Sequence, residues 1–145
     1  MTGPHEHPQP VLPQFDNRPY GQPGHSDPAP VAGLLAAAAD DCAECYRAQV
    51  QAVAADPMLS AHLAACAYTV LKGRSARTGV PVPPVAELAV TYVSTLASAF
   101  AAFSLDGFEY ALMFVREAEP AKRRTAVEQS AALFVEAMTA GELPA

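Results

Sequence analysis

The segment from residue 84 to residue 105 is the part of the chain whose burial the sequence requires most strongly. It reads PVAELAVTYVSTLASAFAAFSL and carries no charged side chain after Glu87. Apolar residues recur along it at alternating spacings of four and three, which is the period of a helix with a heptad-like seam: Val85, Ala89, Tyr92, Leu96, Ala99 and Phe103. Other apolar residues widen this surface, so the pattern predicts a central helix that is buried on most of its sides.

An uncharged run of this length is also compatible with a membrane-spanning helix. The run from Leu88 to Leu105 consists largely of Ala, Ser and Thr, however, and no basic residue lies within ten positions of it. Membrane spans are usually flanked by Lys or Arg on one side. The sequence therefore favours a helix buried inside a water-soluble domain, with no membrane partner.

The composition narrows the classes of function. A chain of 145 residues has room for one domain, and it is 51% hydrophobic and only 17% charged. Its formal net charge of −6 makes it a poor binder of nucleic acid, so no nucleic-acid partner is expected. The first residues lack the basic start and apolar core of a secretory signal, which predicts a cytoplasmic protein. The excess of apolar side chains over charged ones predicts a surface for a partner.

Residues 1–28 differ in composition from the rest. They contain seven prolines among Gly, Gln, Asn and His. Proline removes hydrogen-bond donors and disfavours helix, so these residues are predicted to form a disordered or polyproline-II tail. Such a tail would act as a flexible arm or as a short recognition segment.

The remaining residues, 29–141, are predicted to form one all-α domain, a compact four- or five-helix bundle. Acidic residues followed by proline, at Asp56-Pro57 and Glu119-Pro120, start two of the helices, and Gly73 and Gly141 are expected to end helices. Asp106 and Glu109 have the spacing of a capping box for a short helix. The expected helices are Asp27–Ala55, Met58–Lys72, 84–105, a short helix after Asp106, and Pro120–Ala140.

Three basic residues, Lys122, Arg123 and Arg124, fall in the first turn of the last expected helix. The helix dipole disfavours cations there. Nearby glutamates are expected to compensate them, and contact with a phosphate or an acidic partner is the alternative.

The cysteines supply the one constellation with metal-ligand spacing. Cys42 and Cys45 share a helix face, as do His62 and Cys66 on the next helix. If the two helices form a hairpin that turns near Asp56, Cys45 and Cys66 lie about 16 Å and about 15 Å from the turn, Cys42 about 21 Å and His62 about 9 Å. Cys42, Cys45 and Cys66 can therefore converge, whereas His62 is too far from Cys42 to share an ion.

Three interpretations of these cysteines stay open. They are buried small hydrophobes, a site for zinc or another thiophilic metal or for thiol redox chemistry, or a pair joined by a Cys45–Cys66 disulfide. The first interpretation, which requires no cofactor, is the one that the composition favours. His62 alone is expected at the edge of the hairpin, hydrogen-bonded to Gln49.

The chain carries no recognisable catalytic motif. It has no Gly-rich phosphate loop, no Glu-x-x-His pair and no nucleophile in a known setting. The tyrosines at helical spacing (Tyr46, Tyr68, Tyr92 and Tyr110) are more typical of core than of a pocket. The sequence thus predicts a non-enzymatic helical module that binds a protein partner, with a homodimer as one form of that contact. The alternative is a small metal-binding or thiol-sensing protein that uses Cys42, Cys45 and Cys66.

Overall fold

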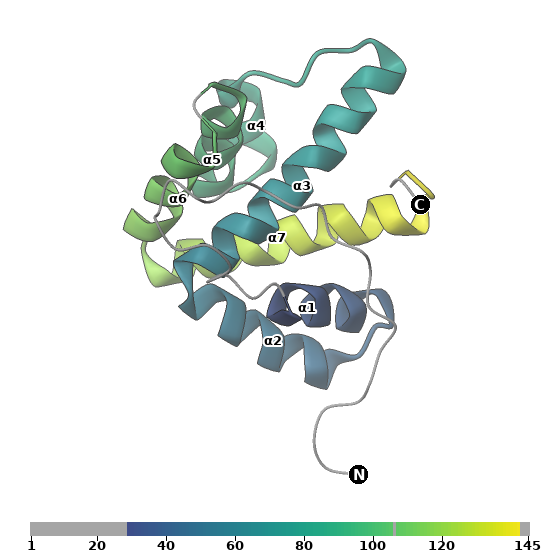
Figure 1. Ribbon diagram of the computed structural model, residues 1–145, viewed down its shortest axis with the longest axis vertical. Helices are drawn as coiled ribbons and strands as arrows, with labels where there is room; N and C mark the ends of the chain where they lie inside the picture. Colours follow the sequence, from purple (N-terminus) through teal and green to yellow (C-terminus); the bar gives the residue numbers. More distant parts are fainter. Residues whose placement is uncertain (1–28, 106, 143–145) are drawn as a thin grey trace.

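The computed structural model describes residues 29–105 and 107–142, and every regular element in these two ranges is an α-helix (Figure 1). The helices are α1 (Ala29–Ala39), α2 (Ala43–Ala55), α3 (Pro57–Thr78), α4 (Val85–Thr91), α5 (Ser94–Leu105), α6 (Phe108–Glu117) and α7 (Pro120–Thr139). The all-α prediction is confirmed. The four- or five-helix bundle is not, because the described residues form seven helices. The prediction for residues 1–28 lies outside the described part of the chain.

Helices α3 and α7 cross near the middle of the molecule and pack against each other (Figure 1). From Leu59 to Val70, every residue of α3 except His62 and Thr69 is buried. Many buried residues of both helices are alanines, which lets the two backbones approach closely. The α1–α2 hairpin packs on α7, and α5 and α6 pack on α3. This crossing therefore holds the other helices in place.

The segment predicted as the central helix is only half buried. Its second half, α5, buries six residues, including Leu96 and Phe100, whereas its first half, α4, buries only Leu88. Val85 and Val90 of α4 are exposed. The central position belongs to α3, whose alanines allow neighbours on nearly every side. None of the helices within the described residues has the combination of length and apolarity needed to cross a bilayer.

This segment is also not one continuous helix. Tyr92 is extended, with φ −117° and ψ 159°, and so separates α4 from α5. The backbone N–H of Val93 donates a 2.8 Å hydrogen bond to the side-chain carbonyl of Gln129 on α7. The break leaves the N–H of Val93 without a partner in its own helix, and Gln129 supplies the acceptor instead. Because this acceptor lies 36 residues away, local periodicity does not reveal the break.

The first expected helix is likewise two helices, α1 and α2. The backbone N–H of Asp41 donates to Ala38 O and that of Cys42 donates to Ala37 O, at 3.2 Å and 2.9 Å. This is the hydrogen-bond pattern of a Schellman motif, whose left-handed position is usually a glycine. Asp41 occupies that position here, with φ 55°. An aspartate gives little sequence warning of a helix end, so the break was not predicted.

The end of α3 corrects a further prediction. Gly73 does not end the helix, which continues to Thr78 and stops at Gly79 in the left-handed conformation, with φ 73°. The last turns are tied to the chain's C-terminal end by ion pairs. Arg74 binds Glu142 at 2.8 Å and Glu136 at 2.7 Å, and Arg77 binds Glu142 at 3.1 Å. These contacts favour continuation of the helix beyond Gly73.

The two acid-proline joints begin helices as expected. Asp56 caps α3, and its carboxylate accepts a hydrogen bond from the backbone N–H of Met58 at 2.9 Å. Pro120 begins α7, which ends one residue short of the expected boundary. Gly107 is the residue that precedes α6, and Asp106 of the expected capping box lies outside the described residues.

The basic first turn of α7 has a structural explanation. Arg123 Nε donates a 2.6 Å hydrogen bond to the carbonyl of Ala54, in the last turn of α2. A cation is favourable at the C-terminal end of a helix dipole, so α2 offsets the unfavourable position of Arg123 within α7. Arg124 pairs with Glu128 at 3.2 Å, as the spacing predicts.

Replacing Gln129 tests the α4–α5 break. We expect Gln129→Ala to lower the free energy of unfolding by about 1–2 kcal/mol, because the half-buried N–H of Val93 loses its acceptor. Gln129→Glu keeps an acceptor oxygen and should retain most of the stability. Urea unfolding measures both variants. Equal stability of wild type and Gln129→Ala would show that this hydrogen bond does not support the break.

Candidate functional site

A cavity of about 500 Å³ lies between the end of α1, the start of α2 and the middle of α7. Small apolar side chains form most of its wall, and a tyrosine, a cysteine and two carboxylates add polar groups. The residues that line it are Ala37, Ala38, Asp41, Cys42, Ala43, Tyr46, Ala132, Val135 and Glu136. Its size and its mostly apolar wall are typical of a small-molecule site.

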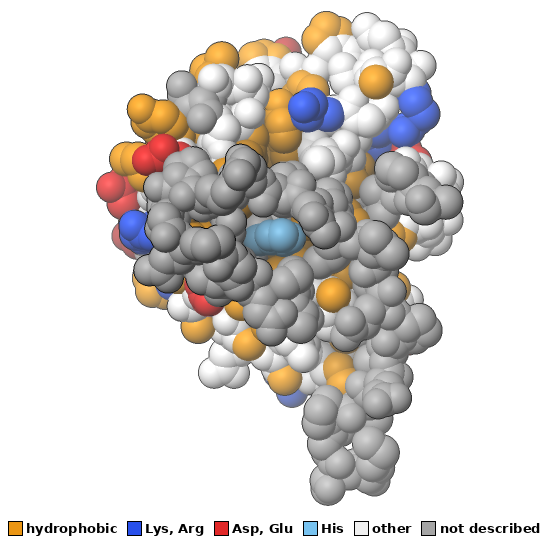
Figure 2. Space-filling view, in the orientation of Figure 1, with side chains coloured by type: hydrophobic (Ala, Val, Ile, Leu, Met, Phe, Trp, Pro, Cys, Tyr) orange, Lys and Arg blue, Asp and Glu red, His pale blue; other side chains and the backbone are white. Residues whose placement is uncertain are grey.

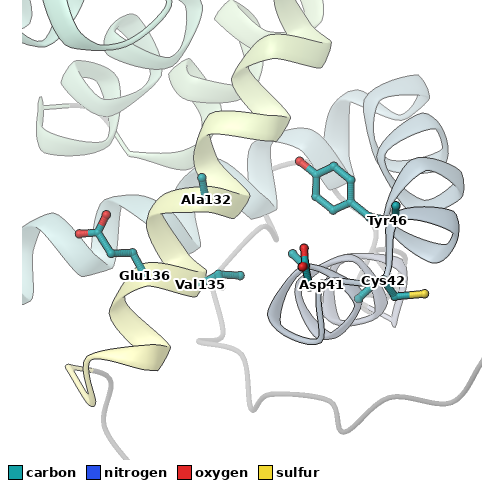
Figure 3. A pocket seen from close by; sticks show the side chains of 9 residues that line it. Asp41, Cys42, Tyr46, Ala132, Val135 and Glu136 are labelled. Carbon is teal, nitrogen blue, oxygen red and sulfur yellow. The ribbon is translucent and has the colours of Figure 1, made fainter.

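The joint between α1 and α2 positions the polar groups of this cavity. Figure 3 shows the carboxylate of Asp41 and the ring of Tyr46 pointing into the space between α2 and α7, whereas the sulfur of Cys42 points away from it. Asp41 is the one non-glycine residue in the described part of the chain with a positive φ. Asp and Asn adopt the left-handed conformation more readily than other residues with a β-carbon, so Asp41 can end α1 where glycine is usual.

The two carboxylates of the cavity differ in their surroundings. Glu136 is paired with Arg74 at 2.7 Å. Within residues 29–105 and 107–142, the Asp41 carboxylate makes no ion pair and no hydrogen bond. None of the described residues that line the cavity is basic. The cavity therefore presents one negative charge that its own wall does not neutralise.

Tyr46 forms the aromatic side of the cavity. Burial raises the pKa of its hydroxyl above the ordinary value, and the nearby Glu128 raises it further while Arg124 opposes this. The phenol is therefore neutral across the physiological pH range. The tyrosine provides a ring face and a hydroxyl, without a charge of its own.

A second candidate surface is the outer face of α6, formed by Tyr110, Met113 and Phe114 and called the α6 patch below. These side chains are 48%, 47% and 45% exposed. The opposite face of the helix buries Ala111, Leu112 and Val115 against the core. Figure 2 shows hydrophobic side chains gathered along the edge of the molecule where α5 and α6 lie, with acidic side chains among them.

The other tyrosines are distributed as follows. Tyr68 stacks on Phe103 with ring centroids 5.7 Å apart and lies at the same distance from Phe100. Tyr92 meets Phe100 edge-on at 5.9 Å. Tyr68 and Tyr92 thus join an aromatic cluster next to the core, Tyr46 lines the cavity, and Tyr110 belongs to the α6 patch.

The predicted site residues Cys42, Cys45 and Cys66 all remain thiols. Cys42 is half-buried at the N-terminal cap of α2, while Cys45 and Cys66 are buried in α2 and α3. Within the described residues, no group of three or more His, Cys, Asp and Glu side chains is arranged to hold a metal ion. Burial raises the pKa of the Cys66 thiol to about 12, so it stays protonated at neutral pH.

The sequence does not reveal the polar side of the cavity. Its apolar periodicity predicts one continuous helix through Asp41, and the helical spacing of the tyrosines predicts that Tyr46 lies in the core. The α6 patch, in contrast, has a signal in the sequence. In FEYALMFVRE, Tyr110, Met113 and Phe114 fall on the face opposite Leu112 and Val115.

Comparisons with protein-family models, with curated proteins and with solved structures found no match to this chain.

Thiol labelling tests the placement of the cysteines. We expect Cys42 to react first with a thiol reagent in the native protein, because Cys45 and Cys66 are buried and only the thiolate attacks. Cys42→Ser should abolish the fast phase, and all thiols should react in denaturant. Labelling of Cys66 as fast as Cys42 in the native protein would contradict the structure.

The pKa of His62 predicts a pH dependence of stability. Burial lowers this pKa below its ordinary value of 6.5, so the unfolded chain binds a proton at this residue more readily than the folded one. The contribution of His62 to stability is present above pH 6.5 and decreases as the pH falls towards its folded pKa. The lowered pKa of Glu142, for which Arg74 is the main cause, acts in a lower window, below pH 4.5.

We therefore expect the unfolding temperature of wild type to fall between about pH 7 and about pH 5 more steeply than that of His62→Gln. Thermal unfolding at several pH values measures the difference. Parallel curves for the two proteins would refute a half-buried His62 that is neutral in the folded state.

Proposed function

We propose that this chain is a non-enzymatic helical module that acts in the cytoplasm through protein–protein contact, and that it forms a homodimer through the α6 patch. The observation that carries the proposal is the exposure of three large apolar side chains, Tyr110, Met113 and Phe114, on one face of one helix. Tyr, Phe and Met are enriched in protein interfaces, and tyrosine is frequent among the residues that contribute most of the binding energy.

The arrangement on α6 supports this proposal. Residues at spacings of three and four lie side by side on a helix, so Tyr110 adjoins both Met113 and Phe114. The opposite face of α6 is already packed on the core through Leu112 and Val115, so the helix cannot turn the patch inwards. Exposed apolar clusters on a folded protein commonly mark a partner site.

A second copy of the chain is a suitable partner for such a patch. A two-fold interface uses the same surface on both subunits, and flexible or aromatic side chains pack readily on their own copies. The patch is bordered by charges of both signs, Glu109, Arg116 and Glu117, all exposed. Two copies therefore do not face each other with blocks of a single charge.

Light scattering tests the dimer directly. We expect wild type at about 100 µM to have a mass well above the 15.2 kDa of one chain. Phe114→Glu should give the monomer mass, because an unpaired carboxylate buried in an interface costs several kcal/mol and weakens the dimer at least about a hundredfold.

Ala48→Glu is the matched control, because Ala48 is exposed on α2 and the substitution adds the same charge outside the patch. This variant should keep the wild-type mass. A monomeric wild type, or an equal loss of mass in both variants, would contradict the proposal.

The alternative function, a thiophilic-metal or thiol-sensing site of Cys42, Cys45 and Cys66, stays a prediction from the sequence. Elemental analysis of protein purified under reducing conditions tests it. Stoichiometric zinc, copper or iron that is lost in Cys66→Ser would support that alternative over the module proposed above.

A further inference from the structure

We infer that the cavity between α1, α2 and α7 binds a small organic cation, namely an ammonium group on an apolar aromatic or aliphatic body, with Asp41 as its counter-ion. This inference does not depend on the homodimer, since the cavity and the α6 patch share no residue. It is argued from the volume, the wall and the charges of the cavity.

The wall of the cavity favours an apolar ligand body. Five of its nine residues are alanine or valine, contributed by α1, α2 and α7. Alanines leave room where larger side chains would fill the space, and the resulting volume of about 500 Å³ suits a molecule of one ring or a short chain. Burying an apolar body against such a wall is favourable and requires no specific polar partner.

The charges of the cavity favour a cation. In the described part of the chain, the wall of the cavity contains two carboxylates, Asp41 and Glu136, and no basic residue. Glu136 is already neutralised by Arg74, whereas Asp41 has no counter-charge among the described residues. Asp41 is exposed, so water solvates its carboxylate when the cavity is empty. An anionic ligand would be repelled by this carboxylate and a neutral ligand would gain nothing from it, whereas an ammonium group would pair with it.

The tyrosine adds a second contact for a cation. The ring of Tyr46 and the carboxylate of Asp41 point into the same space (Figure 3). Cations bind over aromatic faces, and the hydroxyl of Tyr46 can accept a hydrogen bond from an ammonium group. Asp41 would therefore pair with the ammonium group, and Tyr46 would contact that group with its ring and its hydroxyl. The apolar wall, which includes Ala132 and Val135, would contact the body of the ligand.

Three probes that differ in charge test the inference: 2-phenylethylamine, 2-phenylethanol and 3-phenylpropionate. Each is titrated into the full-length, isotope-labelled protein and followed by NMR chemical shifts. We expect the amine to bind with a dissociation constant of about 1 mM or lower and to shift the signals of Tyr46 and Ala132. The alcohol should bind at least about tenfold more weakly, and the carboxylate should not bind.

Asp41→Asn removes the charge and keeps a residue that tolerates the left-handed conformation, so the fold should be retained. We expect this variant to bind the amine about tenfold more weakly. Glu44→Gln is the matched control, since Glu44 is exposed on α2 and does not line the cavity. It should bind the amine like wild type.

A second pair of variants tests the cavity by volume. Ala132→Leu fills the space from α7 and should abolish amine binding, whereas Ala48→Leu adds the same bulk at an exposed position of α2 and should not. The inference is overturned if the amine fails to bind at about 10 mM, if the alcohol binds equally well, or if Asp41→Asn and Glu44→Gln behave alike.

Discussion

The packing of α3 against α7 is the contact on which the rest of the structure depends. Both helices contribute many small side chains to it, and between Leu59 and Val70 α3 is buried on nearly every side. Because small side chains bring the backbones close, other helices can reach the same pair from several directions. The α1–α2 hairpin, α5 and α6 all use this possibility, and the positions of the cavity and of the α6 patch follow from it.

The features that the sequence predicted correctly are those with local causes. Asp56 with Pro57 starts a helix through its own carboxylate, and Pro120 starts another through its fixed backbone angle. The failures have causes that lie far away in the sequence or in an atypical residue. The break at Val93 depends on Gln129, the extension past Gly73 is accompanied by ion pairs to Glu142, and the end of α1 uses Asp41 where glycine is usual. The candidate cavity follows from that last break, and the sequence does not predict it because the apolar periodicity runs through α1 and α2 without interruption.

The low charge content and the many alanines of the chain explain the two candidate surfaces. On α6, apolar side chains occupy an outward face that Lys and Glu usually cover. Beside α7, alanines leave a space that larger residues usually fill. One surface is an exposed helix face with aromatic side chains and the other is a cavity with a carboxylate, so they suit different kinds of partner. They also lie on different helices, which allows both to be occupied together.

The ion pairs of Arg74 and Arg77 with Glu142 and Glu136 join the last turns of α3 to the C-terminal end of α7. They lie at the surface, where dissolved ions screen charges over about 8 Å at physiological ionic strength. The apolar crossing of α3 and α7 is not weakened by this screening. We therefore expect added salt to loosen the two helix ends together, while the middle of the molecule keeps its protection against hydrogen exchange.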